Sequence, residues 1–135
     1  MNVIFRLDKS FEYSEPSLLA SDMEVVLDIP GEGENLKFIF SYVLSYRFQS
    51  SYICVNPIDA YLELAVIENS DMIQHYYGEN VARMGVDVWK PQHFAIYFPE
   101  QKGQYEIIAR SVTIQKAGIP ILQYPKHNAS QSLEE

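Results

Sequence analysis

The sequence predicts one α+β domain over residues 1–124, with a mainly antiparallel sheet of about five or six strands and one main helix packed on it. Three observations predict this class. Residues 36–48 alternate in hydrophobicity, residues 93–110 alternate and then turn back, and residues 69–85 between them have helical spacing. Residues 125–135 are polar and are expected to be a frayed tail.

The chain opens with a predicted strand at residues 2–7, whose odd-numbered apolar side chains share one face. Residues 9–20 are polar and interrupted by a proline, so we expect a loop there, with a short helical turn at residues 17–20. A second strand is predicted at residues 23–29, and the turn sequence PGEGEN follows it. The G-x-G in this turn favours a hairpin turn over a phosphate cradle, because glutamates flank it and the segment that follows is strand-like.

Residues 36–48 are predicted to form a long central strand. Seven alternate positions carry large apolar or aromatic side chains without a gap: Leu36, Phe38, Phe40, Tyr42, Leu44, Tyr46 and Phe48. Such a run does not fit a helix, and a strand of this length is expected to bend or to contain a bulge.

A further strand at residues 62–67 is predicted to lead into the main helix. Asn69 or Ser70 can cap the N-terminus of this helix, because a short polar side chain there accepts a backbone N–H. Residues 73–84 continue the helical spacing, and Gly85 is well placed to end it.

Residues 93–110 are predicted to be a hairpin in which Phe98 lies opposite Gly103. A register one residue different would bury Glu106 in the apolar face without a partner, which costs several kcal/mol. The favoured register turns one face toward the core: Phe94, Ile96, Phe98, Tyr105, Ile107 and Ala109. The second face carries His93, Ala95, Tyr97, Gln104, Glu106, Ile108 and Arg110. The second strand is expected to continue through residues 111–114.

The charge balance restricts the class of partner. Eighteen acidic and ten basic side chains give a formal charge of −8, which disfavours nucleic acid and anionic membrane surfaces and would attract a basic protein. The same acidity also serves solubility alone. Cys54 is the only cysteine, and we recognise no signal peptide or membrane span, so we expect a reducing, cytoplasmic location.

His93 and Glu106 are the candidate pair for chemistry, because they lie one diagonal apart on the hairpin and could act as general acid and base. Such pairs are also routine cross-strand contacts, so no catalytic residue is assigned. No nucleophile elbow, P-loop, C-x-x-C or H-E-x-x-H motif is present. The three histidines and Cys54 have no metal-binding spacing, so no metal or cofactor is predicted.

Aromatic residues point instead to a protein contact. Adjacent tyrosines on the predicted helix can touch a core only at its margins, and the single tryptophan precedes a proline in a connection. Exposed aromatics in an acidic protein are typical of a protein-binding surface, although each could also cap the edge of a small core. The candidate contact residues are Tyr76, Tyr77, Trp89, His93, Tyr97, Glu106 and Arg110.

Three stretches, "FIFSYVLSYRFQSS", "LELAVIENSDMI" and "HFAIYFPEQKGQYEIIARSV", resemble small bacterial immunity-like proteins, the antidotes encoded beside contact-dependent or polymorphic toxins. The resemblance covers roughly residues 36–114. It implies a cytosolic, non-catalytic binder that occludes a toxin's active site, and the acidic charge would suit a nuclease toxin with a basic cleft. The acidic residues are scattered, so no single phosphate-mimicking patch can be named.

We therefore expect a non-catalytic cytosolic protein-binding module, of the immunity-inhibitor type, whose partner is a protein such as a basic toxin domain. Two alternatives stay open. The chain could be a small-ligand binder or an enzyme that uses His93 and Glu106 in a closed pocket with perturbed ionisation. It could also be a structural subunit whose tyrosine-rich face is buried in a homodimer.

Overall fold

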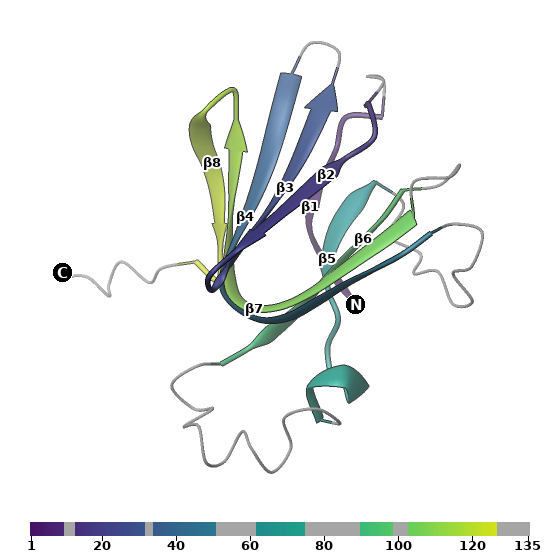
Figure 1. Ribbon diagram of the computed structural model, residues 1–135, viewed down its shortest axis with the longest axis vertical. Helices are drawn as coiled ribbons and strands as arrows, with labels where there is room; N and C mark the ends of the chain where they lie inside the picture. The colour runs from purple at the N-terminus through teal and green to yellow at the C-terminus, as the bar shows by residue number, and fades with distance from the viewer. Residues whose placement is uncertain (10–12, 32–33, 51–61, 75–89, 99–102, 127–135) are drawn as a thin grey trace, which may run out of the picture.

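The computed structural model describes residues 1–9, 13–31, 34–50, 62–74, 90–98 and 103–126 (Figure 1). The strands that it describes all pair antiparallel, in the order β1-β5-β6-β7-β4-β3-β2, and β8 adds to β7. They are β1 (Asn2–Arg6), β2 (Ser17–Ser21), β3 (Glu24–Gly31), β4 (Glu34–Gln49), β5 (Glu63–Val66), β6 (Gln92–Phe98), β7 (Gly103–Lys116) and β8 (Ile119–Tyr124).

The predicted α+β class is wrong. Within the described ranges the protein is an antiparallel sheet of eight strands, more than the five or six expected, and helix is confined to residues 71–74. Most of the predicted main helix falls on residues 75–89, which lie outside the described residues. Helical spacing in one segment is a local pattern, and it does not predict how much of the rest of the chain forms sheet.

Two edge strands account for the larger strand number. β2 takes the place of the predicted loop and helical turn, and β8 was not predicted. Most side chains of both strands are exposed, so neither shows the alternation of buried and polar residues that identifies a strand. Each is held by backbone pairing to a buried neighbour, β3 or β7, and sequence periodicity does not report that pairing.

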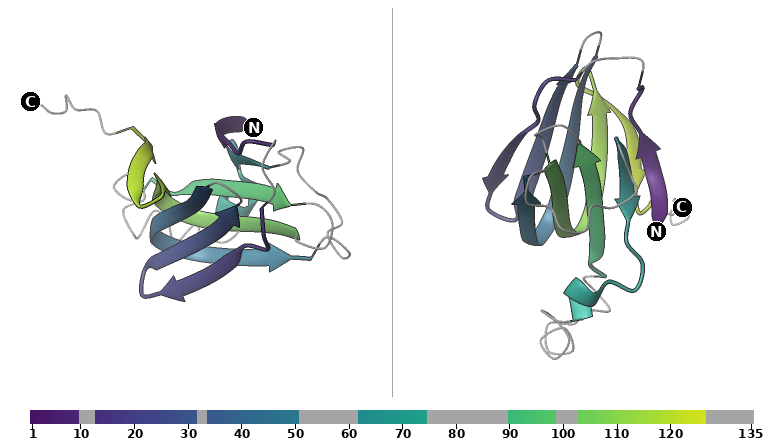
Figure 2. Two further views of the ribbon diagram at one scale, coloured as in Figure 1. Left: turned by 90° about the horizontal axis from the view of Figure 1, so that it is seen from above. Right: turned by 90° about the vertical axis from the view of Figure 1, so that its right-hand side faces the viewer.

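The two longest strands, β4 and β7, run through both halves of a strongly bent sheet (Figures 1 and 2). Residues 34–41 of β4 pair with β3, whereas residues 112–116 of β7 pair with β8. Beyond the bend, residues 103–109 of β7 pair with β6, which continues to β5 and β1. The sheet therefore folds over on itself, and the core lies between its two halves.

The bend breaks the alternation of both long strands. In β4 the pairing slips between Val43 and Ser45, and Tyr42 adopts a left-handed φ of 54°. In β7 the side chains that belong to the hydrophobic core lie at odd positions up to Ala109 and at even positions from Val112 onward. The expected bulge in this strand is confirmed, and the apolar positions of residues 36–48 are buried only as far as Phe40. Three aromatic side chains past that point are each 47% exposed: Tyr42, Tyr46 and Phe48.

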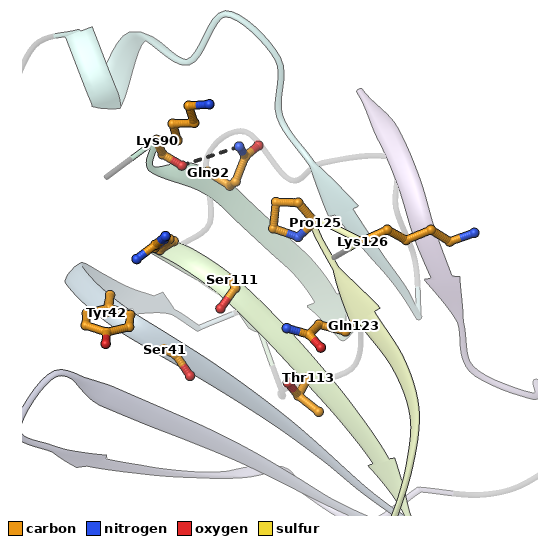
Figure 3. Close-up of a pocket in the computed structure, with 10 residues that line it drawn as sticks. Ser41, Tyr42, Lys90, Gln92, Ser111, Thr113, Gln123, Pro125 and Lys126 are labelled. Carbon is orange, nitrogen blue, oxygen red and sulfur yellow. Dashed lines mark hydrogen bonds between the residues drawn. The ribbon is translucent and has the colours of Figure 1, made fainter. Parts of the chain in front are cut away.

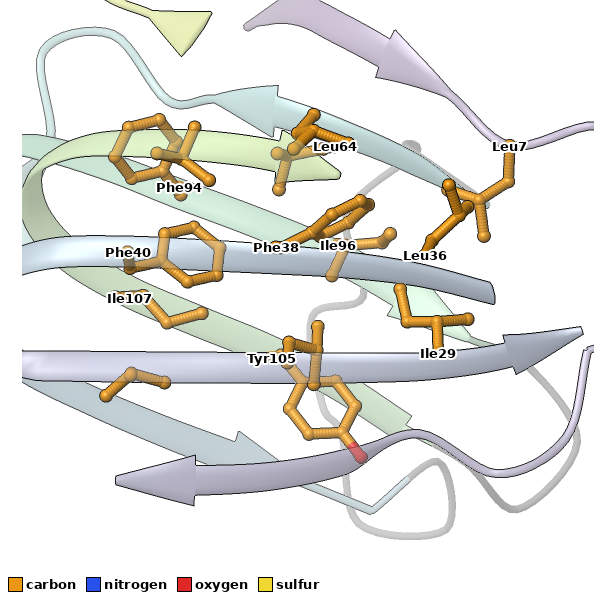
Figure 4. Packing of buried hydrophobic residues seen from close by; sticks show 14 of the residues in the cluster. Leu7, Ile29, Leu36, Phe38, Phe40, Leu64, Phe94, Ile96, Tyr105 and Ile107 are labelled. Carbon is orange, nitrogen blue, oxygen red and sulfur yellow. The ribbon is translucent and has the colours of Figure 1, made fainter. Parts of the chain in front are cut away.

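Aromatic rings join the two halves across the core (Figure 4). The ring of Phe40 on β4 lies 5.4 Å from that of Phe94 on β6, and Phe38 meets Phe5 of β1 edge-on at 5.8 Å.

The predicted hairpin register is confirmed, since Phe98 pairs with Gly103. Its six predicted core residues are all buried, and the strand continues to Lys116 as expected.

Gly103, the first residue of β7, gives a test of how closely β7 approaches β4. It has a φ of +108°, and a Cβ there would overlap the carbonyl oxygen of Gln49 and lie 2.6 Å from a ring carbon of Phe48. Gly118 has a φ of +80°, but no described atom lies within 4 Å of the position that a Cβ would take there. We expect Gly103→Ala to lower the free energy of unfolding by roughly 3–5 kcal/mol and Gly118→Ala by about 1–2 kcal/mol. Urea denaturation measures both, and equal losses would contradict this close approach.

Candidate functional site

Most of the second face of the β6–β7 hairpin is buried. His93 is 5% exposed, and Gln104 and Glu106 are 3% exposed. Buried polar side chains are nearly always hydrogen-bonded, because an unpaired one loses its interactions with water without compensation. These residues therefore have to find their partners within the protein.

Glu106 is the acceptor on which several donors converge. The His93 Nε2 lies 2.8 Å from its Oε1, and the Gln104 Nε2 donates to its Oε2 at 2.8 Å. Arg47 adds its Nε at 3.2 Å and its Nη2 at 3.0 Å. Arg47 lies directly opposite Glu106 in the β4–β7 pairing, whereas His93 lies on the diagonal. The predicted proximity of His93 and Glu106 is confirmed.

Ser70 extends this chain beyond the sheet. Its Oγ lies 2.6 Å from the Nδ1 of His93 and accepts the backbone N–H of Ile73 at 3.2 Å, so it caps the helical turn. With Nε2–H donated to Glu106, the Nδ1 of a neutral ring accepts the hydroxyl proton of Ser70. We call the connected set of Ser70, His93, Gln104, Glu106 and Arg47 the buried polar network.

The network keeps Glu106 ionised. Burial raises its pKa, but hydrogen bonds from His93 and Gln104 and the positive charge of Arg47 outweigh burial and lower the pKa from 4.5 to about 2. The side chain of Arg47 is 47% exposed, so its charge stays in contact with water. The buried carboxylate thus has a neighbouring counter-charge.

The order serine, imidazole, carboxylate also occurs in acyl-transfer enzymes. Ser70 and His93 both line a cavity of about 330 Å³, which lies against Asn2, Ile73 and Tyr124. Because Glu106 has a pKa of about 2, it would orient the imidazole and would not take up a proton near neutral pH. The geometry of the network therefore allows His93 to act as a general base toward Ser70. The same network also links β4, β6, β7 and the helical turn at Ser70.

The structure does not gather the predicted contact residues on one surface. Tyr76, Tyr77 and Trp89 lie outside the described residues. His93 and Glu106 are buried and Tyr97 is half-buried. Arg110 is exposed at the bend, where its guanidinium lies over the ring of Tyr42, 5.5 Å from the centroid.

Sequence reasoning missed two members of the network, for different reasons. Ser70 carried the signal of a helix cap, but a cap does not reveal a second partner 23 positions away. Arg47 fell on the polar side of the long strand, yet only the β4–β7 pairing places it opposite Glu106. A pairing between strands so distant in sequence leaves no local pattern.

An exposed apolar surface was also missed. Met23, Tyr46 and Phe48 are 43%, 47% and 47% exposed, and we call these three residues the aromatic edge. The carbonyl oxygen of Met23 accepts the N–H of Val43 at 3.1 Å, which holds the start of β3 beside the far half of β4. Met23 and Tyr46 also line a notch of about 320 Å³ at the bend.

Two kinds of feature are absent from the described part of the chain. It contains no group of three or more His, Cys, Asp or Glu side chains that could hold a metal ion. None of its helical segments is long and apolar enough to cross a membrane.

Glu106→Gln tests the energetic role of the network. A carboxyl whose pKa is lowered on folding stabilises the protein above its unfolded pKa, here 4.5, and this stabilisation is lost as the pH falls through about 2. We expect Glu106→Gln to remove about 3 kcal/mol near neutral pH and to show a smaller loss of stability on acidification than the wild type.

Glu63→Gln is the matched control, because Glu63 pairs at 2.9 Å with Arg6, whose side chain is 69% exposed. It should cost less than about 1 kcal/mol. Urea denaturation from neutral pH down to about pH 2 gives both values, and equal acid sensitivity of wild type and Glu106→Gln would refute the role assigned to the carboxylate.

No protein-family model matches the chain, and no curated protein or solved structure matches it either.

Proposed function

We propose that the chain is a non-catalytic protein-binding module that uses the aromatic edge as its contact surface. The observation that carries this proposal is the exposure of Met23 and Tyr46, which line the notch at the bend, and of Phe48 two positions farther along β4. Aromatic side chains and methionine are enriched at the centres of protein interfaces, where they bury large areas at low entropic cost. The ring of Phe48 also packs against that of Tyr105, with centroids 4.7 Å apart, so only part of its surface is open to a partner.

The backbone beside these side chains supports the same proposal. Among the described residues, the part of β4 from Ser45 to Gln49 pairs on one side only, with β7. A strand edge of this kind offers unpaired N–H and C=O groups to an incoming segment. A partner could therefore add backbone hydrogen bonds to the contacts made by Tyr46 and Phe48.

Charge favours a basic partner. Asp22 and Glu24 are exposed on either side of Met23, and the whole chain carries a formal charge of −8. Acidic groups at the rim of an interface accelerate association with a cationic protein and become less effective as ionic strength rises. Inhibition of a basic toxin, the setting implied by the resemblance to immunity-like proteins, is one function that meets these requirements.

His93 and Glu106 take no part in this surface. Both are buried and hydrogen-bonded inside the polar network, so they can support the β4 strand without touching a partner. Arg47 links the two regions, because it lies between Tyr46 and Phe48 in β4 and points its guanidinium to Glu106. The network would hold the edge strand in place before a partner arrives.

A second candidate, acyl transfer by Ser70, is favoured by one observation. The hydroxyl and the imidazole of His93 are 2.6 Å apart and line the same cavity. The capping contact of Ser70 with Ile73 explains the same serine without catalysis.

Tyr46→Ser tests the protein-binding proposal, and Leu19→Ser is its control. Leu19 is 72% exposed on β2 and lies outside the aromatic edge, so both changes replace an exposed apolar residue with serine. We expect Tyr46→Ser to weaken the binding of a partner isolated on the wild-type chain by at least about tenfold, whereas Leu19→Ser leaves it within about twofold.

Biolayer interferometry with that partner gives the two affinities, and thermal unfolding checks that both variants fold. Equal affinities for wild type and Tyr46→Ser would refute this contact surface. Sedimentation velocity separates the homodimer alternative, in which Tyr46→Ser would dissociate a dimer of the chain itself.

A fluorophosphonate probe tests the second candidate. An activated serine reacts with it covalently, so acyl-transfer chemistry predicts labelling of the wild type that both Ser70→Ala and His93→Gln abolish. A purely capping serine stays unlabelled, which is the outcome expected from the protein-binding proposal. Intact-mass spectrometry gives the answer directly, with heat-denatured protein as the control for non-specific reaction.

A further inference from the structure

A cavity of about 640 Å³ lies at the bend, where its lining residues Ser111 and Thr113 flank the buried core residue Val112 (Figure 3). Its lining comes from β4, β6, β7, β8 and the residues next to β6 and β8. Figure 3 shows the hydroxyl groups of Ser41, Ser111 and Thr113 on its floor. This volume lies within the range of roughly 300–1,000 Å³ that is typical of small-molecule sites.

The charge of this cavity is opposite to that of the whole chain. Acidic side chains outnumber basic ones by 18 to 10, yet the cavity is lined by Lys90, Arg110 and Lys126 and, among the described residues, by no carboxylate. None of these three cations forms a salt bridge with a carboxylate of the described residues. Three positive charges and no carboxylate around one cavity favour an anionic occupant.

Arg110 is held in place at this site. Its guanidinium lies 5.5 Å from the centroid of the Tyr42 ring, which limits the movement of its side chain without using its N–H donors. A guanidinium can donate two parallel hydrogen bonds to the oxygens of one phosphate group. Arg110 and Ser111 are consecutive in β7, and the interruption of the alternation there lets both side chains line the cavity. The guanidinium of Arg110 therefore lies on the same side of the strand as the hydroxyl group of Ser111.

The two lysines can close over a ligand. Their ammonium groups point outward in Figure 3, and both side chains are exposed, so rotation about the side-chain bonds can bring them toward the cavity. Lys90 precedes β6 and Lys126 follows β8, so the two charges approach from different elements. A ligand with two or more negative charges would satisfy Lys90, Arg110 and Lys126 together.

We propose that this cavity is a binding site for a small organic phosphate. The phosphate group would sit at Arg110 between the two lysines, and a polar body would contact the hydroxyls of Ser41, Ser111 and Thr113 and two neighbouring glutamine amides. The long-range field of the acidic chain repels anions, so the local cluster of cations supplies the attraction. This site is separate from the aromatic edge, and binding at one does not require the other.

Isothermal titration calorimetry of the full chain with three probes tests this site. The probes are inorganic phosphate, a hexose monophosphate and citrate, each at low ionic strength and again at about 0.15 M. We expect the hexose monophosphate to bind more tightly than inorganic phosphate, because its hydroxyls reach the polar floor. Affinity should fall at the higher ionic strength. Citrate that binds as tightly as the hexose monophosphate would overturn the assignment to phosphate.

Variants locate the site. Arg110→Gln should lower the affinity for the hexose monophosphate by about tenfold or more, and Lys90→Gln combined with Lys126→Gln should do the same. Lys37→Gln makes the same charge change at an exposed position of β4 outside the cavity and should leave affinity within about twofold. No heat with any probe, or an equal loss in Lys37→Gln and Arg110→Gln, would overturn the proposal. Thermal unfolding without ligand confirms that each variant is folded.

Discussion

The bend shared by β4 and β7 is the constraint on which the rest of the structure depends. Two long antiparallel strands can turn together only if both interrupt their pleat at the same level, and they do so around Tyr42–Ser45 and Arg110–Ser111. The bend brings the two halves of the sheet face to face, so that Phe40 can meet Phe94. It also leaves Tyr42 exposed, where the ring lines the cavity and contacts the guanidinium of Arg110.

The buried polar network stabilises one half of this arrangement. A carboxylate removed from water is tolerated only with a counter-charge and hydrogen bonds, and Glu106 has both. Its partners come from β4, β6 and β7, and through His93 it reaches the helical turn at Ser70. Any shift in strand register would leave this buried charge unpaired, so the network also disfavours alternative registers. The same geometry resembles a catalytic relay, which is why an enzymatic role for Ser70 merits a direct test.

The two proposed surfaces use opposite charge. The aromatic edge lies next to Asp22 and Glu24, in keeping with the acidic chain, and its geometry supports a basic partner. The cavity at the bend collects three of the ten basic side chains and therefore supports an anionic ligand. Tyr42 and Tyr46 lie close together on the same strand, yet the bulge between them directs one to the cavity and the other to the edge.

The sequence by itself determined the features that depend on residues close together along the chain, namely the positions of several strands and the register of one hairpin. The hairpin register followed from the cost of burying Glu106 in the apolar face, and the positions of β1, β3, β4 and β5 followed from period-two patterns. The proximity of His93 and Glu106 came from the same register. Only the tertiary structure decided the class of fold, the edge strands β2 and β8, the slip in phase at the bend and the partners Arg47 and Ser70. Each of these depends on pairing between segments far apart in the sequence, and the free energy of such pairing leaves no periodic signal in either segment.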